Sequence, residues 1–309
     1  MVDVLMIRDV SARPAIEWPT CLAILLCYGT WLAAGTVVYR FSPVAGLALL
    51  AVAIAFHSSL QHEATHRHPT PSAGLNEILV GLPIGLLYPF RRYRETHLAH
   101  HRDGTLTDPD DDPESYYHDP ARLARLPWPA RWLLGLNNLF LGRLVLGPVV
   151  GFGRFVAADA RRIGRGDGAV RAAWLIHALS LLPVAWIVER VFGMPFWLYL
   201  AGPAYGGAAL IGIRTYCEHQ WHDVPERRTV IVERSWLAPV FLYNNLHIVH
   251  HARPDLPWYR LPAAYRADRQ HWHGLNGGYV YRGYGAITWR YLLRRKEPLA
   301  HPPRRAAGP

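Results

Sequence analysis

The sequence has few cysteines and no recognisable export signal. Cys21, Cys27 and Cys217 form neither a disulfide framework nor a CxxC pair, and the first two lie in an apolar run where a thiol acts as a small hydrophobic side chain. The first apolar run begins near Pro19, behind acidic residues, and no cleavage-like site of small residues ends it. We therefore expect neither a disulfide-stapled fold nor a cleaved signal peptide. No internal repeat is visible.

The charge balance is strongly basic. The 309 residues carry a formal net charge of +10, and 51% of them are hydrophobic. Nucleic-acid binding is one interpretation of such an excess. Because the apolar residues gather in runs of lipid length, however, the excess of arginine favours cytosolic loops of a membrane protein. We expect a lipid bilayer as partner, with anionic headgroups near the arginines, and no nucleic acid.

Four apolar runs are long enough to cross a bilayer, since about 20 helical residues span the ~30 Å hydrocarbon core. They cover residues 19–41, 43–60, 172–192 and 195–214. Links as short as Ser42 or Gly193-Met194 force two antiparallel hairpins. The sequence predicts an all-α integral membrane fold with four transmembrane helices, in a single domain over residues 1–296, and a disordered tail over 297–309. Leu75–Phe90 and Trp132–Phe155 are predicted to be interfacial helices.

Two hairpins place residues 61–171 and 215–309 on one side of the membrane. The stretch 91–171 holds thirteen arginines, whereas the opposite side has little beyond Arg40 and Arg190. The positive-inside rule predicts that the arginine-rich side is cytosolic and forms a helical cap.

Histidines cluster on this side at helical spacing. His62 and His66 are four residues apart, and two later segments repeat the pattern HxxHH. Residues three and four apart share a helix face, so each cluster can direct its rings at one point. The candidate metal ligands are His62, His66, His97, His100, His101, His219, His247, His250 and His251.

Nine imidazoles exceed what one ion requires, because catalytic zinc takes three protein ligands. Four or five ligands for each of two ions would use them all. Imidazole binds iron, zinc, copper and nickel, so the ligand type alone does not choose the metal. Neighbours that could support the ligands are His57, Asn244, Asn245 and Glu218. The histidines expected to face solvent are His68, His118, His271, His273 and His301.

The three clusters resemble the histidine boxes of the membrane fatty acid desaturase and hydroxylase superfamily. The similarity covers roughly residues 45–265 and includes Asp108–Pro113 and the segment after His251, which look like short bacterial desaturases and carotenoid ketolases. The resemblance implies a non-haem di-iron centre, dioxygen as co-substrate and four transmembrane helices with cytosolic boxes. It also implies two electrons from a separate ferredoxin-like or cytochrome-like carrier, and no haem or flavin module is visible in this chain.

Several functions remain open at this stage. We favour desaturation of a fatty acyl or similar lipid-like substrate, with a hydroxylase or ketolase as the alternative. His62-Glu63-Ala64-Thr65-His66 also matches HExxH, the signature of zinc metalloproteases, although this explains only two of the nine histidines. A metal transporter would place its ionisable groups near the middle of the bilayer, whereas these clusters lie outside the apolar runs.

Overall fold

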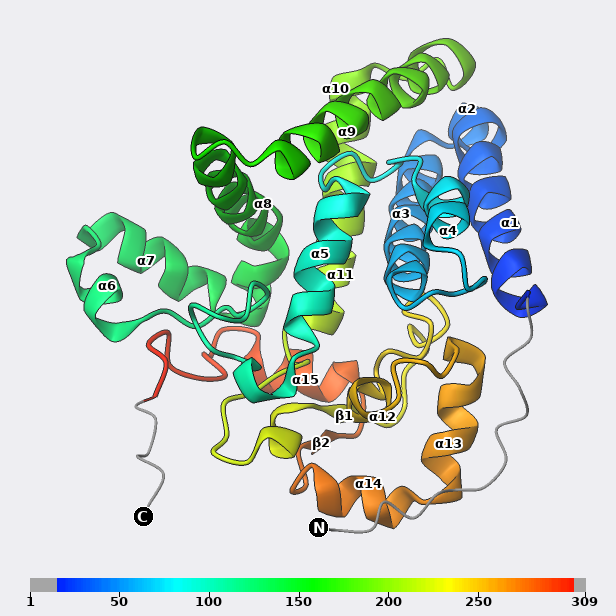
Figure 1. Cartoon of the computed structure of the whole chain (residues 1–309). Coiled ribbons are helices and arrows are strands. Elements are labelled where there is room, and N and C mark those ends of the chain that lie inside the picture. The colour runs from blue at the N-terminus through cyan, green and yellow to red at the C-terminus, as the bar shows by residue number, and fades with distance from the viewer. Residues whose placement is uncertain (1–15, 303–309) are drawn as a thin grey trace.

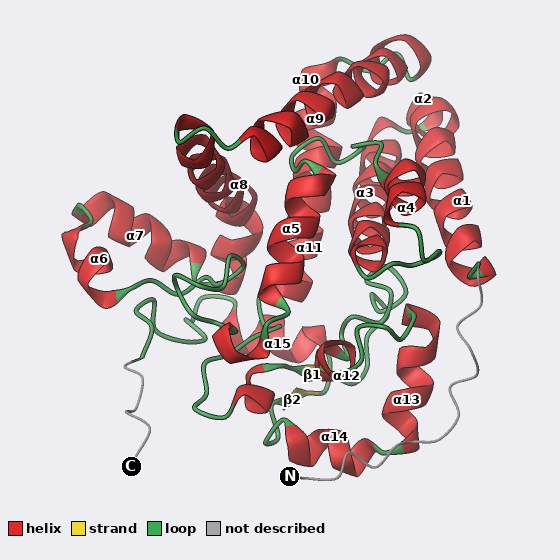
Figure 2. Cartoon of the chain, viewed as in Figure 1, coloured by secondary structure: helices red, strands yellow, loops and turns green. Residues whose placement is uncertain are grey.

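The computed structural model describes residues 16–302, and these are mostly helical (Figure 2). The strands among them are β1 (Ile231–Val232) and β2 (Val280–Tyr281), which pair in parallel. The predicted all-α character is therefore confirmed. The shorter helices are α4 (Ala73–Val80), α5 (Phe90–His100), α6 (Pro120–Arg125), α7 (Trp128–Asn137), α12 (His247–Ala252), α13 (Leu261–Ala267), α14 (Arg269–Leu275) and α15 (Tyr284–Tyr291).

The first hairpin forms as predicted. α1 (Trp18–Ala33) continues through a π-helical stretch (Ala34–Val38) into α2 (Tyr39–Phe41), and α3 (Pro43–Thr65) returns beside it. The link, Ser42, is extended, and its hydroxyl accepts a hydrogen bond from the backbone N–H of Ala45 at 3.4 Å. Proline at the first helical position loses no hydrogen bond there, so Ser42 and Pro43 together start α3.

The second hairpin follows the predicted limits closely. α9 (Gly168–Trp186) and a π-helical turn (Ile187–Val191) lead through Gly193, at φ +66°, to α10 (Phe196–Tyr199), a second π-helical turn (Leu200–Ala204) and α11 (Tyr205–Thr215). α11 packs against α3, where the missing side chain of Gly207 allows close approach: a Cβ there would lie 2.5 Å from Ile54. This packing sets the C-terminal ends of α3 and α11 near each other (Figure 1).

A buried polar contact joins the two hairpins. The indole of Trp31 on α1 donates to the hydroxyl of Tyr199 on α10 at 2.7 Å. That hydroxyl in turn donates to the backbone carbonyl of Ile84, also at 2.7 Å. One tyrosine thus fixes α1, α10 and the loop before α5 relative to one another.

The segments between the hairpins differ from the prediction. The expected interfacial helix Leu75–Phe90 is not continuous: α4 ends at Val80, and turns lead from there to α5. The other expected interfacial segment is divided into α7 and a long α8 (Phe140–Gly164). Among the described residues, five helical stretches are therefore long and apolar enough to cross a membrane, and α8 is the one that the sequence did not predict to cross.

The predicted disordered tail does not begin at Glu297. The carboxylate of Glu297 accepts a hydrogen bond from Tyr116 at 3.1 Å, and its carbonyl accepts one from Asn138 at 2.7 Å. Ala300 forms a backbone bridge with His118. The chain is thus anchored at least to residue 302, and residues 303–309 lie outside the described part.

Candidate metal centre

The structure brings all nine predicted histidines together, although they come from four places in the chain. The last turn of α3 supplies His62 and His66, and His219 follows α11. α5 and the residue after it supply the second cluster, and α12 supplies the third. The rings form two groups whose ligand atoms lie within 4.8 Å of one another: His62, His66, His97, His101 and His250 in the first group, and His100, His219, His247 and His251 in the second.

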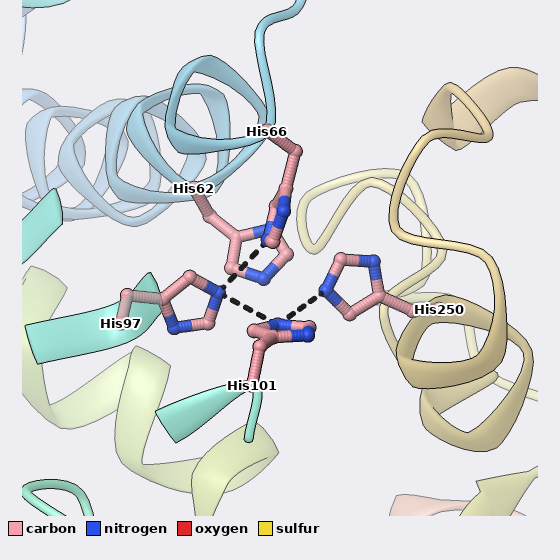
Figure 3. A group of neighbouring side chains, drawn as sticks. All are labelled: His62, His66, His97, His101 and His250. Carbon is pink, nitrogen blue, oxygen red and sulfur yellow. Dashed lines mark hydrogen bonds between the residues drawn. The ribbon is translucent and has the colours of Figure 1, made fainter. Parts of the chain in front are cut away.

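The first group draws on all three clusters (Figure 3). The Nε2 atoms of His66 and His101 each lie 3.1 Å from Nε2 of His97. Nε2 of His250 lies 3.2 Å from that of His101. The ring of His62 faces that of His250 at 4.5 Å between centroids. Five imidazoles therefore surround one small volume.

The second group is built around His219. Nε2 of this residue lies 3.0 Å from Nε2 of His100 and 3.0 Å from Nε2 of His247. His251 completes the group, and its ring stacks on that of His101 at 4.2 Å between centroids. The two groups are consequently direct neighbours.

The expectation that each HxxHH cluster points at one site is wrong. His97 and His101 belong to the first group, but His100 belongs to the second. The helix turns by about 100° per residue, so side chains four apart differ by about 40° and adjacent side chains by about 100°. The third cluster mirrors this arrangement, because its i, i+4 pair joins the second group and His250 joins the first.

The spacing of the ring nitrogens fits metal ions. Ligand nitrogens about 2.1 Å from one ion and at right angles to each other are roughly 3.0 Å apart. The Nε2 atom of His62 is buried and has no hydrogen-bond partner among the described residues. A buried polar atom left unpaired costs about 1–3 kcal/mol, which a bound ion would offset. The donor set therefore suits metal binding.

Burial keeps most of these rings neutral, as metal binding requires. It lowers the pKa of His66 to about 2 and holds the pKa of His101 and of His250 below the usual range. His100 differs: burial alone would lower its pKa, but the carboxylates of Glu114 and Asp112 raise it to about 9. Below that pH the metal-free ring carries a proton that an ion must displace, so metal affinity of the second group rises with pH.

Acidic and amide side chains orient the rings from behind. Nδ1 of His97 lies 2.9 Å from Glu114, and Nδ1 of His100 lies 2.8 Å from Asp112. Nδ1 of His247 lies 3.0 Å from the side-chain oxygen of Asn244. Carboxylates and amide oxygens accept, so each Nδ1 carries a hydrogen and leaves Nε2 as the atom that can present a lone pair to the group, once the additional proton of His100 is lost.

The predicted supporting residues differ in whether they contact the metal-ligand rings. Asn244 contacts a ligand ring, and its amide nitrogen donates to Glu218 at 3.3 Å. Asn245 donates instead to the carbonyl of Val232, where it supports β1. Nε2 of His57 lies 3.1 Å from the hydroxyl of Tyr28, and His57 belongs to neither group of histidines.

Two histidines expected to face solvent are buried. Nδ1 of His68 lies 2.7 Å from the buried carboxylate of Glu17, and His301 packs against Tyr117. His271 is exposed as expected, whereas His118 and His273 are half-buried. Glu17 and Tyr117, the partners of His68 and His301, are each more than fifty residues away in the sequence, so local spacing gave no signal.

The acidic loop after the second cluster has a larger role than its sequence indicated. Asp112 in this loop is buried against His100, and its other carboxylate oxygen accepts a hydrogen bond from the backbone N–H of Thr107 at 2.8 Å. Arg214, which no motif singled out, is buried beside Glu218, with 2.7 Å between Nε and Oε1. The sequence did contain a signal for Asp112 and Glu114, because both carboxylates lie within fifteen residues of a histidine cluster.

Replacing Asp112 with asparagine should lower metal affinity at the second group by about 10- to 100-fold, because the ring of His100 loses its charged acceptor. Metal titration of the purified variant, followed by inductively coupled plasma mass spectrometry, measures the change. Asp110→Asn is the matched control, because Asp110 is exposed in the same loop and pairs with Arg122. Equal affinity in both variants would contradict the role given to Asp112.

A family model described as fatty acid desaturase matches residues 40–283 of the chain. The match includes all nine histidines, α3 and the whole second hairpin. No curated protein matches the chain significantly.

Proposed function

Because the chain belongs to the fatty acid desaturase family, we propose that it is a membrane-bound, dioxygen-dependent di-iron desaturase of a fatty acyl or similar lipid-like substrate. The family makes the chain a lipid-modifying oxidoreductase. The observation that supports the finer proposal is the division of nine histidines, most of them buried, into groups of five and four, which provides ligands for two ions.

The residues around the two groups would position and shield the reaction. Two bound irons would supply the oxidising chemistry that breaks an unactivated C–H bond, which no side chain can do. The histidines hold the ions, and Asp112, Glu114 and Asn244 fix the ring orientations. Most of the rings are buried, so bulk water is kept from the site. Electrons would come from a separate ferredoxin-like or cytochrome-like carrier.

A zinc metalloprotease fits the site poorly. The glutamate of the HExxH match, Glu63, is buried, and its carboxylate accepts a hydrogen bond from the backbone N–H of Trp258 at 3.1 Å. Its other oxygen lies 3.7 Å from Nδ1 of His62, so it supports a ligand ring. A general base must instead reach a metal-bound water.

Mass spectrometry of lipids and metabolites from cells with and without the protein tests this function. Desaturation gives a product lighter by two hydrogens, whereas hydroxylation gives one heavier by an oxygen. The alternative of a hydroxylase or ketolase is adopted if only oxygenated products accumulate. Cleaved peptides with no lipid change would contradict both.

We also propose that four of the five candidate helices cross the membrane. Nε2 of His100 and Nε2 of His219 are 3.0 Å apart, so the chain between them must cross an even number of times. Three candidates lie in that interval: α8, α9 with its π-helical turn, and α10 with α11. They cannot all cross.

Charge placement supports α8 as the helix that does not cross. Arg143 and Arg154 leave ten uncharged residues between them, or about 15 Å of helix, half the ~30 Å core. In α9 and its π-helical turn, seventeen uncharged residues lie between Arg171 and Glu189, which is about 26 Å of helix. α8 therefore lies along the interface, and the arginine-rich side that carries the histidines is cytosolic.

This topology predicts opposite labelling of two engineered cysteines in a background lacking the half-buried Cys21. Applied to intact cells, a membrane-impermeant maleimide should label Arg190→Cys and leave Arg165→Cys unlabelled until the membrane is opened. Both positions are exposed. Labelling of Arg165→Cys from outside would mean that α8 crosses.

A further inference from the structure

A cavity of about 1250 Å³ lies beside the candidate metal centre. It is lined by residues of α3, α5, α8, α11 and the loop 109–119, among others. His219 of the second histidine group lines one part of it, and apolar residues such as Ile54, Leu87 and Ile211 line another. A molecule in this cavity can therefore have an apolar portion and still reach the site.

Small residues form much of the cavity wall. Gly147 and Gly151 line it from α8, Ala204 from the π-helical turn before α11, and Ala208 from α11. A Cβ at Gly151 would lie 3.5 Å from the hydroxyl of Tyr88, so the glycine leaves space that a larger side chain would fill. The wall is thus open to an elongated apolar chain.

Two arginines of α8 line the same cavity without a carboxylate partner. Arg143 donates to the backbone carbonyl of Asn137 at 3.2 Å, and its guanidinium lies over the ring of Tyr116. Arg154 donates to the backbone carbonyl of Ser115 at 3.2 Å. Eleven residues make close to three helical turns, so both side chains project from one face of α8 toward adjacent residues of the loop.

The acidic residues that line the cavity have other partners. Those partners are His100 for Asp112, His97 for Glu114, Arg214 for Glu218, Arg92 for Asp159 and Glu95, and Arg122 for Asp110 and Asp119. No carboxylate among the described residues lies within ion-pair distance of Arg143 or Arg154. Two neighbouring cations in a cavity wall repel each other unless an anion lies between them.

We propose that Arg143 and Arg154 bind the anionic head group, a carboxylate or phosphate, of an acyl substrate whose chain lies in this cavity. Guanidinium groups bind both anions through paired hydrogen bonds. The proposal rests on the proposed function and narrows it, because a neutral carotenoid or alkane offers nothing to this pair of charges. The interfacial placement of α8 sets both arginines at the depth where lipid head groups lie.

Binding of matched amphiphiles to the purified full-length protein in neutral detergent tests the proposal. The probes are hexadecanoate, hexadecyl phosphate and methyl hexadecanoate, with dissociation constants from calorimetry. The two anions should bind at least about tenfold more tightly than the methyl ester, since hydrogen bonds to charged groups are strong. Arg143→Gln and Arg154→Gln should each remove about that advantage and leave methyl ester binding unchanged.

Arg131→Gln is the control, because Arg131 is exposed on α7 and does not line the cavity. Arg143→Lys and Arg154→Lys should keep part of the preference, which distinguishes lost charge from lost folding. Equal affinity of acid and methyl ester in the unmodified protein would overturn the proposal, as would an equal loss in Arg131→Gln. Complete competition by millimolar inorganic phosphate would show a free-anion site instead of a head-group site.

Because this assay reads binding and not turnover, its result is independent of whether the protein desaturates. If lipid profiling finds no oxidised product but the anion preference and its loss are observed, the proposed function fails and the head-group site stands. If product forms but the anions bind no more tightly than the methyl ester, the proposed function stands and the head-group site fails.

Discussion

Replacing His100 or His250 with alanine abolishes product formation, with a loss on the order of 10³-fold or more, while the protein still inserts into the membrane. Each substitution removes one ligand from a different group, so each disrupts a different ion. Product formation by mass spectrometry and the amount of protein in the membrane fraction measure the two effects separately.

His271→Ala serves as the matched control for both ligand variants. His271 is exposed on α14 and belongs to neither group, so its removal should leave activity and metal content unchanged. Turnover near the unmodified level in His100→Ala or His250→Ala would remove that group from the catalytic site.

The second large effect concerns stability. Arg214 and Glu218 form a buried ion pair, and Glu218 also accepts from Asn244, which orients His247. Glu218→Gln leaves a buried guanidinium without its counter-charge, which should lower the free energy of unfolding by about 3–5 kcal/mol. Thermal unfolding of the purified protein in detergent measures the loss.

The double variant Arg214→Met/Glu218→Gln distinguishes the charge effect from general damage. Without the guanidinium, the uncompensated charge is gone, so the double variant should be more stable than Glu218→Gln alone. Arg269→Met is the control, because its ion pair with Glu233 is exposed and contributes about 0–1 kcal/mol. A double variant that is less stable than Glu218→Gln alone would contradict this explanation.

Local spacing predicted the three histidine clusters, because three- and four-residue intervals on a helix are set by backbone geometry alone. His219 stands alone in the sequence, and only the predicted topology put it on the same side as the clusters. It could not divide them into groups. His100 and His101 are adjacent yet serve different groups, and so do His250 and His251. That division depends on how α5 and α12 face each other, which is a property of tertiary packing.

The supporting residues were harder to predict for a related reason. Asn244 lies three residues before its partner His247, so a local argument could find it. Glu17 and His68 are 51 residues apart, and Arg154 reaches Ser115 across 39 residues. Runs of hydrophobic residues gave the four long apolar segments, but α8 mixes apolar and charged residues, and its length alone does not show whether it crosses.

Iron content per chain tests the account most directly. Fully active protein, purified in detergent without added metal, should hold two irons per chain, one for each histidine group. In His250→Ala and His247→Ala the content should fall, with the loss at the first and second group respectively. Full activity with a single metal ion per chain, or with zinc and no iron, would contradict the two-iron site.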